Sequence, residues 1–172
     1  MPDDAWVHAG KTMAVSGEGL VLTKTGGGNY NRVVTGGEVL SDGVHTWEVV
    51  LSSGATSNRN LTVYVGVAIE GLDVEKGNHY NKGNAWYIRT LDGSLYGGGE
   101  DNGDAHGAGA FRIGDRVGLR LDCADGSLQF SKNGELFGAG FPAGTITVPV
   151  VRAVELVCQG QSVSLVPGAA VA

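Results

Sequence analysis

Residues Gly114 to Phe141, GDRVGLRLDCADGSLQFSKNGELFGAGF, contain two tight-turn signals eight residues apart, each between short apolar segments. The signals are Asp125-Gly126 and Asn133-Gly134, dipeptides that tolerate the positive φ angles of primed hairpin turns. Apolar residues occupy every second position from 117 to 123, so a period of two turns them toward one face of a strand. The stretch therefore predicts a β-meander with one buried face.

The composition extends this prediction to the whole chain. Of its 172 residues, 30 are glycine and 42% are hydrophobic, and the apolar runs between glycines are short. This pattern indicates the turns of a many-stranded fold rather than disorder. We expect an all-β, two-layer antiparallel sandwich of about a dozen strands, with the jelly-roll architecture of lectins. Residues 1–166 are expected to form one domain, followed by a flexible C-terminal tail at 167–172.

Alternating apolar residues define the expected strands and the expected core. The strands are Thr12–Val15, Val21–Thr23, Tyr30–Val34, His45–Leu51, Leu61–Ile69, Ala85–Arg89, Ser94–Tyr96, Arg116–Cys123, Leu128–Lys132, Leu136–Phe137, Val148–Val154 and Ser162–Leu165. Trp47, Val49 and Leu51 share one face, as do the apolar residues at odd positions from 61 to 69, and these faces should form the core. Trp47 and Trp86 lie within regular strands, so we expect them to pack in the core rather than to form an aromatic binding wall.

The stretch from 114 to 141 resembles the central signature of the SPRY domain family. That signature is a GD-x-hydrophobic-G strand followed by a D-x-x-x-G-x-hydrophobic-x-F-x-x-NG hairpin. Four further segments match family motifs in the same order: Gly43–Val49, Val65–Ala68, Ala85–Ile88 and Val148–Val151. The leucine-aspartate-proline motif of the PRY extension is not found, so the chain looks like a plain SPRY domain.

The resemblance implies a function as well as a fold. It implies a non-catalytic protein-protein interaction module that binds a partner peptide or protein surface through loops at one end of the sandwich. Such a module serves as a substrate-recruiting or scaffolding element. Peptide-binding relatives carry a tryptophan after the late strand, where this chain has Glu155-Leu156-Val157. The resemblance therefore implies the position of the binding surface in this chain, but not the identity of the ligand.

The charge and the cysteines narrow the range of partners. Eighteen acidic residues against twelve basic ones give a net charge of −6, which argues against nucleic acid as the main partner. No apolar run approaches the roughly 20 residues of a membrane span, and the N-terminus lacks the pattern of a secretory signal. Cys123 and Cys158 lie in different apolar strands and are expected to be core residues without a disulfide. We expect a cytoplasmic protein with no membrane partner, and leave its oligomeric state open.

No pattern in the chain predicts catalysis, a metal or a cofactor. Glu70, Asp73 and Glu75 are the nearest approach to a carboxylate cluster. Asp73 and Glu75 would share a strand face, but Glu70 lies three residues before Asp73 and would point away, so the register does not fit a sandwich glycosidase. The segment 100–104, EDNGD, lacks the spacing of a calcium loop. The glycine clusters at 26–28 and 97–99 lack the lysine and the strand-to-helix context of a phosphate loop.

The expected binding residues lie in the long polar loops, because loops on a rigid sandwich are where recognition usually resides. In peptide-binding relatives, an aromatic residue of the loop after the V-G-V-A strand often contacts the peptide, and here Tyr80 takes that place. Asn78 and Asn81 are expected to bind a peptide backbone, and Arg32 or Arg59 to pair with an acidic side chain. The full set of candidate partner-binding residues is Tyr80, Asn78, His79, Asn81, Arg59, Asn58, Tyr30 and Arg32.

Two other functions fit the sequence less well. A lectin-like sandwich would place Tyr80 as an aromatic platform for a sugar, with Asn78 and Asn81 as polar ligands. A structural subunit of a large complex would instead use a flat surface patch that one sequence does not reveal.

Overall fold

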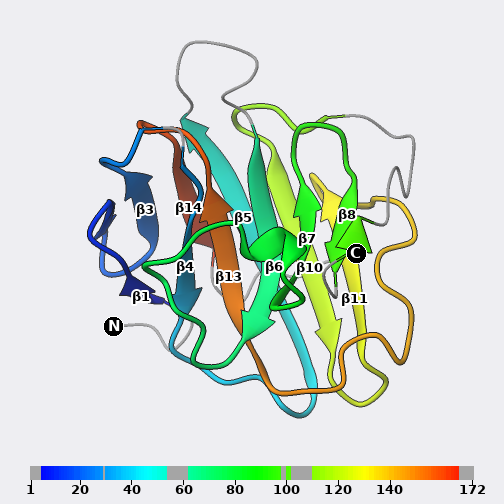
Figure 1. The fold of residues 1–172 in the computed structure, drawn as a ribbon. Coiled ribbons are helices and arrows are strands. Elements are labelled where there is room, and N and C mark those ends of the chain that lie inside the picture. Colours follow the sequence, from blue (N-terminus) through cyan, green and yellow to red (C-terminus); the bar gives the residue numbers. More distant parts are fainter. Residues whose placement is uncertain (1–4, 29, 54–61, 98–99, 102–109, 167–172) are drawn as a thin grey trace.

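Two antiparallel sheets stack face to face in the computed structural model, which describes residues 5–28, 30–53, 62–97, 100–101 and 110–166 (Figure 1). Within these residues there are fourteen strands, seven in each sheet. The expected two-layer antiparallel sandwich is therefore confirmed. The tail expected at 167–172 lies outside the described residues.

The first sheet, which we call sheet A, carries the candidate binding surface. Its strands, in spatial order, are β1 (Trp6–Ala9), β4 (Arg32–Gly36), β13 (Val150–Leu156), β6 (Val63–Ile69), β7 (Ala85–Arg89), β8 (Leu95–Gly97) and β9 (Glu100–Asp101). The second sheet, sheet B, has the order β12 (Glu135–Leu136), β11 (Ser127–Lys132), β10 (Arg116–Asp122), β5 (Val44–Ser53), β14 (Ser162–Val166), β3 (Val21–Lys24) and β2 (Met13–Ser16). Strands β1 and β9 were not expected from the sequence.

The predicted β-meander is present as β10, β11 and β12. Gly126, Asn133 and Gly134 have φ angles of 77°, 52° and 89°, the left-handed conformations that the two turn dipeptides favour. Leu119 pairs with Phe130 of β11 on one side and with Trp47 of β5 on the other. The meander therefore continues directly into the centre of sheet B.

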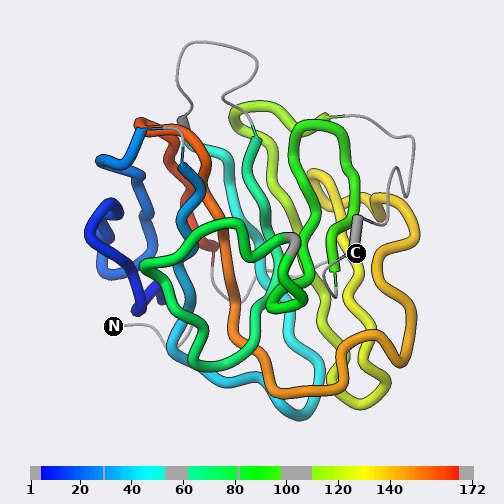
Figure 2. Tube along the Cα trace, viewed as in Figure 1, coloured from blue at the N-terminus to red at the C-terminus, as the bar shows by residue number. Residues whose placement is uncertain are grey.

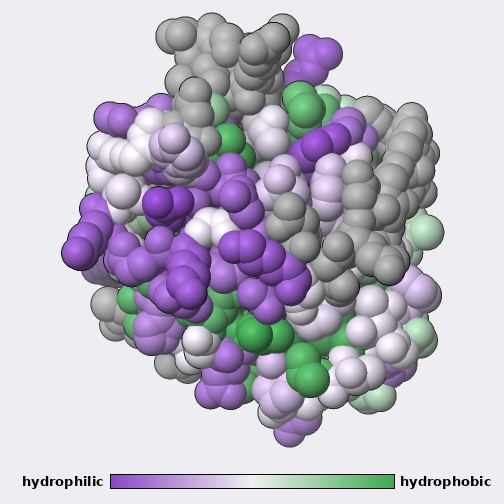
Figure 3. All heavy atoms as spheres, in the orientation of Figure 1, coloured by the Kyte–Doolittle hydropathy of each residue, from purple (hydrophilic) through white to green (hydrophobic). Residues whose placement is uncertain are grey.

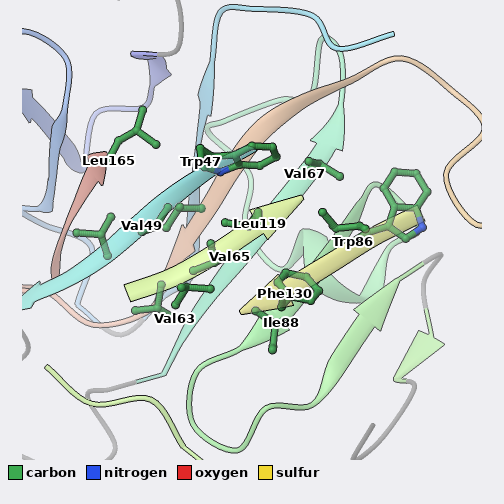
Figure 4. Packing of buried hydrophobic residues seen from close by; sticks show 14 of the residues in the cluster. Trp47, Val49, Val63, Val65, Val67, Trp86, Ile88, Leu119, Phe130 and Leu165 are labelled. Atoms are coloured by element: carbon green, nitrogen blue, oxygen red, sulfur yellow. The ribbon is translucent and has the colours of Figure 1, made fainter. Parts of the chain in front are cut away.

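The core lies between the two sheets and follows the period of two (Figure 4). From sheet B, Trp47 and Val49 face the valines of β6 at positions 63, 65 and 67. Trp47 is fully buried and Trp86 is only 8% exposed, so the expectation that both pack in the core is confirmed. Burial of each such side chain stabilises the fold by about 1.5–3 kcal/mol, and a one-residue slip would turn the whole set outward.

The charged side chain of Arg152 packs against this core. Arg152 of β13 is buried, and its guanidinium lies 4.8 Å from the centre of the Trp47 ring. Its Nη1 donates a hydrogen bond to Glu38 Oε2 at 2.6 Å, which supplies the opposite charge. The cation is thus held by a π face and a carboxylate instead of water.

The outer face of sheet A carries a second apolar cluster. It consists of Val33, Tyr64, Ala68, Ala85, Tyr87, Tyr96 and Ala153. The segment of residues 70–84, between β6 and β7, crosses in front of β13 and β6 (Figure 2). Leu72, Val74 and Tyr80 of this segment pack against the cluster. The segment is therefore a cover on sheet A, and it includes the one-turn 3₁₀ helix η2 (His79–Asn81).

Gly66 allows β6 and β7 to come together beneath this cover. A Cβ atom at Gly66 would lie 1.9 Å from the carbonyl oxygen of Trp86 on β7, a contact that only backbone movement can relieve. A Cβ at Gly36 of β4 would meet its nearest heavy atom, the carbonyl oxygen of Ala5, at 3.5 Å, which is an ordinary contact.

We expect Gly66→Ala to lower the free energy of unfolding by about 3 kcal/mol, because the clash is with backbone and not with a flexible side chain. Gly36→Ala is the matched control and should stay within about 1 kcal/mol of wild type. Urea unfolding of the three proteins measures both values. Equal stability of the two variants would show that the β6–β7 approach is not a constraint.

Candidate partner-binding surface

The turn that carries Tyr80 begins with an unusual backbone conformation. Asn78 has φ 61° and ψ 35°, a left-handed conformation that asparagine adopts more readily than most residues. The chain therefore reverses at Asn78 and enters η2, with the His79 side chain directed into the protein and Asn78 exposed. We call residues 77–82 the Tyr80 turn.

Glu155 of β13 holds the Tyr80 turn against sheet A. Its side chain is fully buried, and its Oε1 accepts a hydrogen bond from the His79 backbone N–H at 2.8 Å. A second backbone N–H, that of Tyr80, also donates to the carboxylate. Asn31, just before β4, donates from Nδ2 to Oε2 at 3.4 Å. One carboxylate thus joins β13, the Tyr80 turn and the start of β4.

Burial governs the ionisation of Glu155. It raises the pKa of the Glu155 carboxyl from 4.5 to about 7, although the hydrogen bonds from His79, Asn31 and Tyr80 favour the charged form. The hydroxyl of Tyr87 is also buried, has no hydrogen-bond partner among the described residues, and has its pKa raised by burial and by the nearby Glu155 charge. The carboxylate therefore lies in an apolar site with only neutral donors in contact.

The His79 side chain fixes the turn from within and does not face outward. It is 3% exposed, with Nε2 at 3.0 Å from the Asp73 carbonyl oxygen and Nδ1 at 3.1 Å from Asn84 Nδ2. A neutral imidazole that donates from Nε2 and accepts at Nδ1 satisfies both contacts. Burial, the largest influence, lowers the pKa of His79, which favours this neutral form. His79 is therefore a structural residue of the turn, with its side chain buried beneath the surface.

Tyr80 forms the aromatic centre of the surface. Its ring stacks on Tyr64 of β6, with centroids 4.6 Å apart and an interplanar angle of 10°, and meets Tyr96 edge-on at 5.4 Å. The guanidinium of Arg89 lies 5.3 Å from the centre of the Tyr96 ring and pairs with Asp92. These contacts fix the Tyr80 ring in one place while leaving part of it accessible.

The first residue of β4 and the residues just before it lie beside the Tyr80 turn. Arg32 donates from Nη1 to the Asn31 carbonyl oxygen at 2.7 Å, and a Cβ placed on Gly77 would be 3.0 Å from this same Nη1. Tyr30 is 73% exposed. The buried Lys24 Nζ donates to the carbonyl oxygens of Gly26 and Gly28, at 2.6 and 2.7 Å, and so orders the preceding turn. We define the Tyr80 surface as residues 30–32 together with residues 77–82.

The structure brings together five of the eight residues that the sequence nominated. Tyr30, Arg32, Asn78, His79 and Tyr80 all lie in or beneath the Tyr80 surface. Asn81 is part of η2, but its side chain is not described. Asn58 and Arg59 lie outside the described residues. Sequence reasoning missed the role of Glu155, for which the signal was a carboxylate that, together with Arg152, interrupts the apolar run VPVVRAVELV.

The surface above the turn is hydrophilic rather than deeply hollowed. Figure 3 shows hydrophilic side chains gathered over the part of this face that the segment 70–84 crosses in Figure 1. A hollow of about 310 Å³ lies at the other end of that segment, between Leu72, Val74, Thr35 and Val151. The Tyr80 surface is therefore open and not an enclosed cavity. An open surface of this kind suits contact with another macromolecule better than binding of a small molecule.

The carboxylates considered for catalysis serve the backbone of the same segment. Glu75 Oε1 accepts a hydrogen bond from the Lys11 N–H, and Asp73 Oδ1 accepts one from the Glu75 N–H, each at 3.0 Å. Among the described residues, no group of three or more His, Cys, Asp or Glu side chains is placed to hold a metal ion. No helix in the described ranges is long and apolar enough to cross a membrane.

Comparison with known proteins places these features in a family context. A family model described as "SPRY domain" matches residues 44–169. The F-box/SPRY domain-containing protein 1 of Culex quinquefasciatus and that of Aedes aegypti are each 29% identical over 110 residues, covering 58% of this chain and 40% of the relative. The chain thus spans about 40% of the length of the curated relatives it matches.

Solved structures show the same fold. The crystal structure of the SPRY domain of human HERC1 is similar with a TM-score of 0.77 and 20% identity, covering 93% of this chain and 95% of that one. The TRIM65 PSpry domain gives a TM-score of 0.66 at 17% identity, covering 92% of this chain and 87% of that one. At these identities the similarity concerns the fold alone.

We expect Glu155→Gln to become more stable relative to wild type as pH rises. A carboxyl whose pKa is higher folded than unfolded binds more protons in the folded state, so its contribution to stability is lost between the unfolded pKa of 4.5 and the folded value of about 7. Glutamine cannot ionise, so the difference in unfolding free energy should grow by about 2.5 kcal/mol from pH 5 to pH 8 in favour of the variant.

Chemical unfolding of both proteins at these two pH values gives this difference directly. His79, whose lowered pKa acts in the opposite direction, is present in both proteins and cancels. A difference that does not change with pH would show that Glu155 is ionised in the folded protein throughout this range.

Proposed function

The chain belongs to the SPRY family, and from this membership and the geometry of the Tyr80 surface we propose that it is a non-catalytic protein-interaction module that binds a peptide or protein through Tyr80 and its neighbours. The main support for this site is the stacking of the partly exposed Tyr80 ring on Tyr64, above a turn that Glu155 holds against the sheet. A fixed aromatic ring offers contact area without a large loss of side-chain entropy on binding.

The charges on the surface support a polar or acidic partner. Within the described residues, the ion pairs with carboxylates use Arg89, Arg116, Arg120, Lys132 and Arg152. Arg32 and Lys82 instead donate to backbone carbonyl oxygens, at 2.7 and 3.0 Å. A protein with a net charge of −6 therefore presents two cations at its candidate site, where a carboxylate of a partner would find them.

The relatives suggest the setting in which such a module acts. Their name places a SPRY domain and an F-box in one protein, and this chain matches 40% of that length. We infer a recruiting or scaffolding role, in which the Tyr80 surface brings a partner to a larger assembly inside the cell. The sandwich spanning residues 1–166 is the part that performs the binding.

Tyr80→Ala is expected to weaken partner binding by more than about 1 kcal/mol, the range of an interface hot spot. Because the Tyr80 ring also stacks on Tyr64, we expect a loss of folding stability of about 1 kcal/mol, which leaves the protein folded. Affinity capture from a lysate of the source organism, followed by mass spectrometry and by titration of the captured protein, measures the change in binding.

Two further variants make the result specific. Tyr80→Phe keeps the ring and should bind within a few-fold of wild type, and Leu136→Ala alters an exposed residue of β12 on sheet B and should not affect binding. Equal capture by wild type and Tyr80→Ala would move the site to another face. Capture of no protein, together with binding on a glycan array, would replace the proposal with a lectin function.

A further inference from the structure

Glu155 is a buried acid without a cation in contact. None of the ion pairs among the described residues includes it, and its contacts are the neutral N–H groups of His79, Tyr80 and Asn31. A buried carboxylate held only by neutral donors loses more solvation when it is charged than when it is protonated. Its proton therefore bears on how firmly the Tyr80 turn is held.

Among the titratable groups around Glu155, the Glu155 carboxyl is the one best placed to gain or lose a proton near neutral pH. From β7, the Tyr87 hydroxyl faces it, with its pKa well above the usual value. From the turn, Lys82 favours the charged form of Glu155 weakly, and the His79 imidazole is engaged with the Asp73 carbonyl and Asn84. On the two neighbouring strands, Val33 of β4 and Tyr64 of β6 are its register partners.

Arg32 and Asp73 complete the charged neighbours. The Arg32 guanidinium is bound to the Asn31 carbonyl oxygen, and Arg32 influences Lys24 electrostatically. The Asp73 carboxylate accepts the Glu75 N–H and so belongs to the preceding part of the segment. Neither makes an ion pair with Glu155 among the described residues.

We propose that Glu155 is a positioning residue whose protonation fixes the Tyr80 turn to sheet A, and whose ionisation above neutral pH loosens the turn. When the turn lifts from the sheet, the carboxylate reaches water and ionises freely, so loss of the proton favours the lifted state. The consequence, that partner binding through Tyr80 weakens as pH rises through neutrality, rests on the function proposed above.

The size of the effect follows from proton linkage. With a pKa of about 7 in the docked turn and 4.5 when the carboxyl is solvated, the equilibrium constant for lifting rises about tenfold between pH 6 and pH 8. Local opening of this kind is what amide hydrogen exchange reports.

The test is the amide exchange of His79 and Tyr80, measured by NMR at pH 6 and pH 8 and normalised to the rates of an unstructured peptide. Wild type should lose about tenfold protection at these two amides between the two pH values, whereas Glu155→Gln should show no change. The amide of Leu119 in β10 is the internal control and should not respond in either protein. Equal pH dependence of the two amides in wild type and Glu155→Gln would overturn the proposal.

A second measurement uses wild type alone and covers the case in which the variant does not fold. The side-chain carboxyl carbon of Glu155, followed by NMR, should titrate near neutral pH, and a midpoint at the ordinary value for glutamate would overturn the proposal. Failure of the proposed binding function is distinguishable from failure of this proposal. The amide exchange and the carboxyl titration are measured without a partner, so both would give the expected results even if Tyr80 bound no partner protein.

Discussion

The arrangement of the proposed binding surface depends on the hydrogen bonds from the Tyr80 turn to the Glu155 carboxylate. Glu155 lies on β13, which is flanked by β4 and β6 and so has little freedom to move. Backbone donors at the start of a turn must be satisfied when they are buried, and here a carboxylate from the sheet satisfies them. The position of the surface is thus set by the sandwich, and the turn follows it.

These hydrogen bonds explain why the aromatic residues on the outer face of sheet A are in contact with one another. Tyr64 and Tyr96 project from β6 and β8, and Tyr80 joins them only because its turn is drawn down to the sheet. The tyrosines cover an apolar surface that would otherwise face water, while their hydroxyl groups remain suited to polar contacts. The same burial that fixes Tyr80 also leaves Glu155 with a proton that is bound and lost near neutral pH.

The fold was largely predictable from the sequence because its signals are local. The two turn dipeptides and the alternation of apolar residues determine neighbouring strands without knowledge of the rest of the chain, and they placed Trp47 and Trp86 in the core correctly. The short strand β1 was not predicted, because Trp6–Ala9 has no clear alternation of apolar and polar residues and is recognised only by its pairing with β4.

The site was less predictable because it depends on contacts between distant segments. The sequence nominated Tyr80 through a family resemblance, but it did not show that His79 turns inward or that Glu155 accepts its N–H across 76 residues. The contact of Arg152 with Trp47 was not predicted for a similar reason, because only the packed structure places the Arg152 guanidinium over the Trp47 ring. Polar residues within apolar strands carry no local signal of the partner that will satisfy them.

Binding of a partner through the Tyr80 surface is tested most directly by site-specific photo-crosslinking in extracts of the source organism, with p-benzoylphenylalanine placed either at position 80 or at position 136 on sheet B. If the partner binds at Tyr80, a covalent adduct with one partner protein forms at position 80 and none forms at position 136, where Leu136 is 61% exposed. An adduct formed at position 136 and not at position 80 would contradict binding at Tyr80, because the binding surface would then lie on the opposite sheet.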